Sequence, residues 1–152
     1  MSIFNIFRKK PQMPATIEDG MASQANDFIN AFRGSGAPID AAKLDFGRDS
    51  VLLVDQVLQD FYSQGVQLPD DLHFLASAYV FECARKLYGG RYLRGDQQNP
   101  FVLVIGEPDF QIGFCAMEKV LGRATNGPED NLLFFFDGIE SPYQQKKSIT
   151  LV

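Results

Sequence analysis

The chain has no tryptophan, one histidine and two cysteines among 152 residues, and these shortages exclude several chemistries. Because His73 is the only imidazole, a Ser–His–Asp or Cys–His arrangement would have to be built on that residue alone. Cys83 and Cys115 form neither a CxxC pair nor a Cys/His cluster, which argues against zinc. Neither thiol has an adjacent basic residue that would lower its pKa. We therefore expect no catalytic residue, no metal and no cofactor.

The same cysteine pattern indicates the compartment. Two isolated cysteines inside apolar runs are typical of buried thiols in a reducing environment, which predicts a cytoplasmic protein. A disulfide between Cys83 and Cys115 is the less favoured alternative, since nothing else in the sequence indicates secretion.

Long apolar runs and basic stretches are also lacking. No segment approaches the length of a membrane span, and no glycine-rich phosphate-binding motif follows an expected strand. The net charge is −5, and basic residues cluster only at Arg8–Lys10 and Lys146–Lys147. Nucleic-acid binding needs a continuous basic surface, so we expect no nucleic-acid partner. An acidic surface suits a basic protein partner instead.

Residues 1–14 are expected to form a separate amino-terminal segment. Its first ten residues are apolar and then basic, the reverse of a secretory signal peptide. We expect the segment to be flexible or to dock its phenylalanines on the domain. The alternative is contact of residues 1–10 with an anionic membrane surface, for which the segment is short.

What the sequence does contain is the material for one folded domain. The apolar fraction is 45% and the charged fraction 22%, values of an ordinary globular protein with a phenylalanine-rich core. We expect residues 15–140 to form a single α+β domain. Residues 141–152 are expected to be a tail or an edge strand, and residues 148–152 within them could be a loose tail, an added edge strand or a segment that pairs with a neighbour.

Helical periodicity dominates the first part of the chain. An amphipathic helix is predicted over 17–33, with Thr16 as its N-cap. Further helices are predicted over 48–64 and 70–88, the last capped by Asp70. The short link between these two helices favours an antiparallel hairpin.

From Gly89 onward the pattern changes to short alternating or continuous apolar runs, which favour a small antiparallel sheet of two to four strands. The expected strands lie at 91–94, 100–106 and 110–112. Short carboxy-terminal helices are predicted over 114–123 and 129–137, with a strand as the alternative for the second. The Ser141–Pro142 pair is expected to end the compact body.

The helix over 70–88 is apolar on two opposite sides, yet it carries Glu82 and Arg85. Such charges must be paired, reach solvent or serve a site. One interpretation is a buried network that ties the helix to the sheet and to residues 126–130; the other is a groove for a partner or small ligand. The candidate binding residues are Glu82, Arg85, Arg91, Tyr92, Lys119, Arg123, Glu129 and Asp130.

The run Tyr79-x-x-Glu82-x-x-Arg85-x-x-x-Gly89-Gly90-Arg91-Tyr92, followed by Lys119-Val120 and Asn126-Gly127-Pro128-Glu129-Asp130, carries a resemblance. It resembles a loose group of uncharacterised bacterial α+β domains, in which a helix with Glu and Arg ends at Gly-Gly-x-aromatic. The similarity covers residues 44–137, and Tyr92 stands where the group usually has Trp. The resemblance implies a bacterial cytoplasmic α+β protein, in some cases of immunity or accessory type, and no catalytic residue.

These observations predict a non-enzymatic protein-binding module. The alternative is a small-molecule-binding protein or enzyme with a pocket near Glu82, Arg85 and Lys119.

Overall fold

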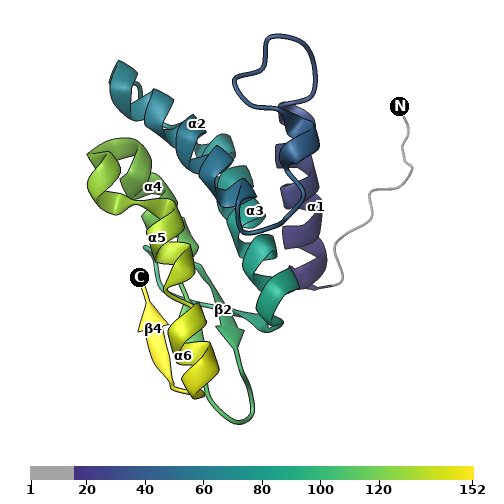
Figure 1. Ribbon diagram of the computed structural model, residues 1–152, viewed down its shortest axis with the longest axis vertical. Helices are drawn as coiled ribbons and strands as arrows, with labels where there is room; N and C mark the ends of the chain where they lie inside the picture. The colour runs from purple at the N-terminus through teal and green to yellow at the C-terminus, as the bar shows by residue number, and fades with distance from the viewer. Residues whose placement is uncertain (1–15) are drawn as a thin grey trace.

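The computed structural model describes residues 16–152, which form a group of helices packed on one another and a small four-stranded sheet at one end of it (Figure 1). The predicted α+β class is confirmed. The predictions for residues 1–14, including membrane contact by residues 1–10, lie outside the described residues. The elements are α1 (Ile17–Ala31), η1 (Ala41–Lys43), α2 (Ser50–Gln64), α3 (Asp70–Tyr88), β1 (Arg91–Arg94), β2 (Phe101–Ile105), β3 (Ile112–Phe114), α4 (Ala116–Asn126), η2 (Pro128–Asp130), α5 (Leu132–Asp137), α6 (Glu140–Gln145) and β4 (Ile149–Leu151).

Helix α3 is the central element, and its two apolar sides have two different neighbours. Residues 76–84 are all buried. On one side α3 packs along α1, where Phe28 lies 5.3 Å from Tyr79 between ring centroids. On the other side Phe81 meets Phe114 of the sheet edge to face at 5.9 Å. The two-sided apolar pattern is thus the signature of a helix between layers.

The helix boundaries follow local sequence signals with small differences. Thr16 caps α1 as predicted, accepting a hydrogen bond from the Asp19 backbone N–H at 3.1 Å. Asp70 is the first residue of α3 rather than its cap, and Pro69 occupies the cap position without a side-chain bond. The predicted α2–α3 hairpin is loose, because α2 packs mainly against α4 and α3 against α1.

The sheet has the strand order β1-β2-β3-β4 and is mixed rather than antiparallel. β1, β2 and β3 pair antiparallel, whereas β4 pairs parallel with β3, placing Gly113 beside Thr150. The prediction of a purely antiparallel sheet is wrong at this strand. The reason is the connection, since α4, α5 and α6 carry the chain back before β4 begins, as a parallel pairing requires.

The carboxy-terminal region continues the folded body past Ser141–Pro142. The predicted helix over 129–137 is divided into η2 and α5, and Asn131 caps α5 by accepting from the Phe134 N–H at 2.7 Å. Pro142 lies in the first turn of α6, where proline costs no helical hydrogen bond. The prediction that this pair ends the compact body is therefore wrong. Residues 141–145 belong to α6, and the strand β4 at the edge of the sheet covers Ile149–Leu151.

Candidate functional site

The predicted site residues fall into separate clusters, the first around Glu82. The Glu82 side chain is 1% exposed and accepts two hydrogen bonds from Arg85, at 2.8 and 2.9 Å. The Tyr92 hydroxyl donates to the same carboxylate at 2.7 Å, and the Tyr92 backbone N–H donates to Glu18 at 2.8 Å. Burial raises the pKa of Tyr92, so its hydroxyl remains a donor at neutral pH. This cluster fastens α3 to β1 and α1.

The second cluster centres on a buried ion pair between helices. Arg123 is 4% exposed and donates to Asp55 at 2.9 and 3.0 Å and to Gln59 at 2.6 Å. Asp55 also accepts from the Leu132 backbone N–H at 3.0 Å. The Nη1 atom of Arg123 has no hydrogen-bond partner, and it is the one such buried side-chain polar atom among residues 16–152. The pair therefore joins α2, α4 and the start of α5.

Lys119, Glu129 and Asp130 lie near this second cluster. Asp130 accepts from Asn126 at 2.9 Å and from Lys119 at 3.2 Å, and these bonds lower the pKa of its carboxyl group. Glu129 is exposed. No hydrogen bond or ion pair within the described residues connects Glu82 or Arg85 to the turn at 126–130.

The predicted network from Glu82 to the sheet is present through the Tyr92 hydroxyl, whereas its predicted extension to residues 126–130 is wrong. Glu82 and Arg85 pair with each other, and Arg91 pairs with Glu107. Lys119 pairs with Asp130 instead of facing Glu82. The alternative of a small-molecule pocket lined by Glu82, Arg85 and Lys119 loses its main support, since these charges are occupied by neighbours.

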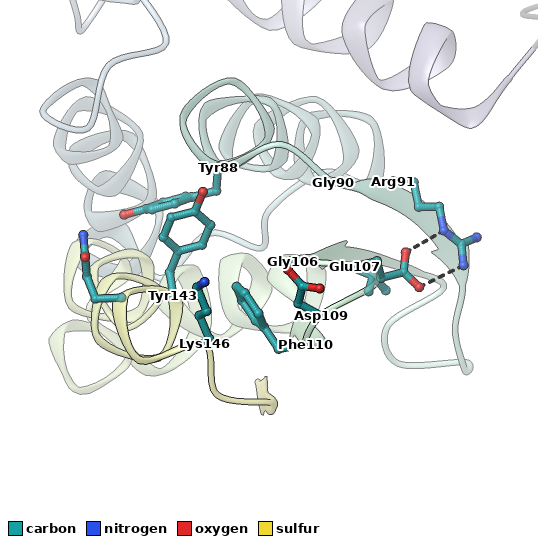
Figure 2. A pocket seen from close by; sticks show the side chains of 11 residues that line it. Tyr88, Gly90, Arg91, Gly106, Glu107, Asp109, Phe110, Tyr143 and Lys146 are labelled. Atoms are coloured by element: carbon teal, nitrogen blue, oxygen red, sulfur yellow. Dashed lines mark hydrogen bonds and ion pairs between the residues drawn. The ribbon is translucent and has the colours of Figure 1, made fainter.

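A concave surface open to solvent lies elsewhere, between the end of α3, the β2–β3 turn and α6 (Figure 2). It is an open groove of about 690 Å³. The Tyr88 and Tyr143 rings lie 4.9 Å apart between centroids, and Phe110 meets Tyr143 edge to face at 6.0 Å. Figure 2 shows the rings gathered toward one end and the Arg91–Glu107 pair at the other.

Two contacts hold the aromatic wall in place. The Tyr88 hydroxyl donates to Glu140 at 2.7 Å, joining the end of α3 to α6, and burial raises the pKa of that hydroxyl. Gly106 has φ +102°, and a Cβ there would clash with the Phe110 ring. Only glycine lets the ring lie against the turn in this way.

Two of the charged side chains at the groove form an ion pair with each other, and two others do not. Arg91 donates to Glu107 at 2.7 and 3.1 Å, and this pairing lowers the pKa of the Glu107 carboxyl group. Asp109 and Lys146 are exposed, and neither side chain makes a hydrogen bond or ion pair with any residue in 16–152. These two charges are available to a bound molecule.

Of the predicted residues, only Arg91 lines this groove. Tyr88, Phe110 and Tyr143 come from three distant segments, so periodicity gives no indication that their rings meet. Asp55 could have been found, since an acid on the apolar stripe of α2 predicts a buried partner.

The residues considered for catalysis are His73, Cys83 and Cys115, and the structure shows the surroundings of each. The Nε2 atom of His73 lies 2.7 Å from the Met117 carbonyl oxygen, which links α3 to α4. Cys83 and Cys115 are free and buried, and burial raises the pKa of Cys83 to about 12. Within residues 16–152, no cluster of His, Cys, Asp or Glu could hold a metal ion, and no helix has the length and apolar character to cross a bilayer.

Comparison of the chain with family models, curated proteins and solved structures gives no match.

Proposed function

We propose that the protein is a non-enzymatic binding module of the immunity or accessory type that recognises another protein in the bacterial cytoplasm. The observation that carries the proposal is the groove at Tyr88, Phe110 and Tyr143, where aromatic faces lie beside the carboxylate of Asp109, which pairs with no residue in 16–152. Glu82 and Arg123 are buried and engaged by neighbouring side chains, whereas this groove is open to a partner.

Charge favours a partner that presents an arginine or lysine side chain. A cation over a tyrosine face is attracted by the ring, and a free carboxylate beside it adds a charge-assisted hydrogen bond. The described part of the chain is more acidic than the whole, because Arg8–Lys10 lie outside it and no acid precedes Glu18. A basic protein is therefore drawn toward this surface, whereas nucleic acid is repelled.

The shape of the groove favours a protein over a small molecule. Small-molecule sites typically bury some 70–90% of their ligand, which requires walls on several sides. This groove is open to solvent, and two of its charges already pair with each other. A side chain on a partner needs no such enclosure, since the body of the partner covers the remaining face.

The test is a capture experiment with matched charge variants. The full-length chain is immobilised, exposed at modest salt to extract of the source bacterium, and compared with Tyr143→Ala, Asp109→Lys and Asp27→Lys. Asp27 is an exposed aspartate on α1 and serves as the control for charge. We expect one stoichiometric protein on the parent chain and on Asp27→Lys, and binding at least tenfold weaker on the two groove variants.

Calorimetry with the purified partner then fixes the affinities. Equal affinity of all four proteins would contradict the groove as the site, and recovery of no stoichiometric protein would contradict the binding function itself. Lys146→Glu is a further check. It replaces a positive charge of the groove with a negative one, which should tighten the binding of a basic partner.

A further inference from the structure

The outer edge of β4 is open, and it lies beside the most exposed large apolar side chain of the described residues. The Ile149 N–H donates to the Gln111 carbonyl at 3.1 Å, and the Leu151 carbonyl accepts from the Cys115 N–H at 2.9 Å. Backbone groups alternate in direction along a strand, so the N–H and C=O of Thr150 point away from β3. No strand within residues 16–152 pairs with that side.

Phe134 of α5 is 81% exposed and lies next to this edge, as Figure 1 shows for α5 and β4. A hollow of about 350 Å³ separates the two elements and is lined by Phe134, Thr150, Leu151 and Val152. Ile149 is 43% and Val152 65% exposed. An exposed apolar edge of this kind is a template for an added strand.

We propose that β4 pairs antiparallel with β4 of a second copy of this chain, across a two-fold axis at Thr150. The observation that selects a second copy is self-complementarity. The register that places Thr150 opposite its own copy also places Ile149 opposite Leu151 and Ser148 opposite Val152. Ile149 and Leu151 lie on one face of the strand by alternation, and Leu151 lines the hollow beside Phe134.

The flanking charges also fit a second copy. Glu129 lines the same hollow as Val152, and its side chain makes no hydrogen bond or ion pair with residues 16–152. In the proposed register Val152 of one copy faces Ser148 of the second copy. Lys147 of the second copy, which precedes that serine, therefore comes toward Glu129 of the first copy. The lysines at 146 and 147 lie at opposite ends of the strand pair and do not repel each other. The assembly is a closed dimer with a continuous sheet.

The direct test is a disulfide across the axis. Residues directly opposite in a hydrogen-bonded antiparallel pair have Cα atoms about 5.5 Å apart, within the range that a disulfide spans. Mild oxidation of full-length Thr150→Cys should therefore give a covalent dimer on a non-reducing gel. Ser148→Cys is the matched control, because its opposite residue is Val152, and it should stay monomeric on the gel.

Sedimentation equilibrium of the parent chain and charge variants gives the second measurement. Glu129→Lys and Lys147→Glu should each weaken dimerisation about fivefold, since each breaks two exposed ion pairs of modest strength. The double variant should restore it, and Asp60→Lys, an equal change on an exposed residue of α2, should leave it unaltered. A parent chain that stays monomeric at all concentrations overturns the proposal, as does equal cross-linking of both cysteine variants. Pairing with a different protein would give neither the Thr150→Cys dimer nor restoration by the double variant.

Discussion

The two edges of the sheet are treated differently by the rest of the molecule. At β1, the Glu18 carboxylate accepts from the outward Tyr92 N–H, and arginines stand at both ends of the strand. At β4, the outward backbone of Thr150 is unpaired among the described residues, and the flanking side chains are apolar. Charge and capping block strand addition at one edge, while the other is left able to accept it.

The largest loss in the free energy of unfolding should come from replacing Glu82, the acid that fastens β1 to α3. Glu82→Ala removes the acceptor of both Arg85 and the Tyr92 hydroxyl, leaving a buried donor unpaired. We expect a loss of about 3 kcal/mol in the free energy of unfolding, as for a broken buried ion pair. Urea denaturation followed by circular dichroism measures it, and a loss below about 1 kcal/mol would show that β1 is held by packing alone.

A smaller effect is expected from uncovering the β1 edge directly. Glu18→Ala removes the carboxylate that accepts the Tyr92 N–H, a charge-assisted bond worth about 1–2 kcal/mol. Hydrogen exchange of the Tyr92 amide should accelerate in the same variant. Asp19→Ala is the control variant, because only the backbone N–H of Asp19 bonds to Thr16, and it should leave the exchange of the Tyr92 amide unchanged. Unchanged Tyr92 exchange would contradict protection by Glu18.

Near the β4 edge, Asp130 should give a pH-dependent effect. The pKa of its carboxyl group is lowered in the fold, so its stabilisation is present above the unfolded pKa of about 3.9 and is lost as pH falls through the folded value. Asp130→Asn should cost roughly 0.5–1 kcal/mol at pH 7 and much less at pH 2. Urea titrations at both pH values measure the difference, and an equal cost at both would contradict a charged role.

The smallest effect on folding should come from the exposed phenylalanine beside β4. Phe134→Ser removes an 81% exposed ring, so the free energy of unfolding of the monomer should change by less than about 0.5 kcal/mol. Measurement on dilute protein separates folding from self-association. A large loss would mean that Phe134 packs within the monomer. The contrast with Glu82→Ala then separates residues that build the fold from residues that serve a surface.

Local signals predicted most of the elements because their causes are local, but the strand expected over 110–112 lies at Ile112–Phe114 and the following helix begins at Ala116. The bounds of α3 follow from its apolar spacing and from Gly89, and the bounds of β1 from alternation. Side-chain partners were predicted less well. Asp55 and Arg123 are 68 residues apart, and the Tyr88, Phe110 and Tyr143 rings come from three elements. Their meeting depends on how α3, α4 and α6 pack, which no window of sequence contains.

The sequence by itself determined the α+β class, the cap at Thr16 and the central position of α3, since hydrogen bonding and amphipathic spacing act between near neighbours. Only the tertiary structure decided that β4 runs parallel to β3, that Arg91 pairs with Glu107, and that the accessible groove lies at Tyr143 rather than at Glu82. The direction of β4 and the place of the groove depend on the long connection through α4–α6, whereas the Arg91–Glu107 pair follows from the register of β1 on β2. The same connection leaves one edge of the sheet open.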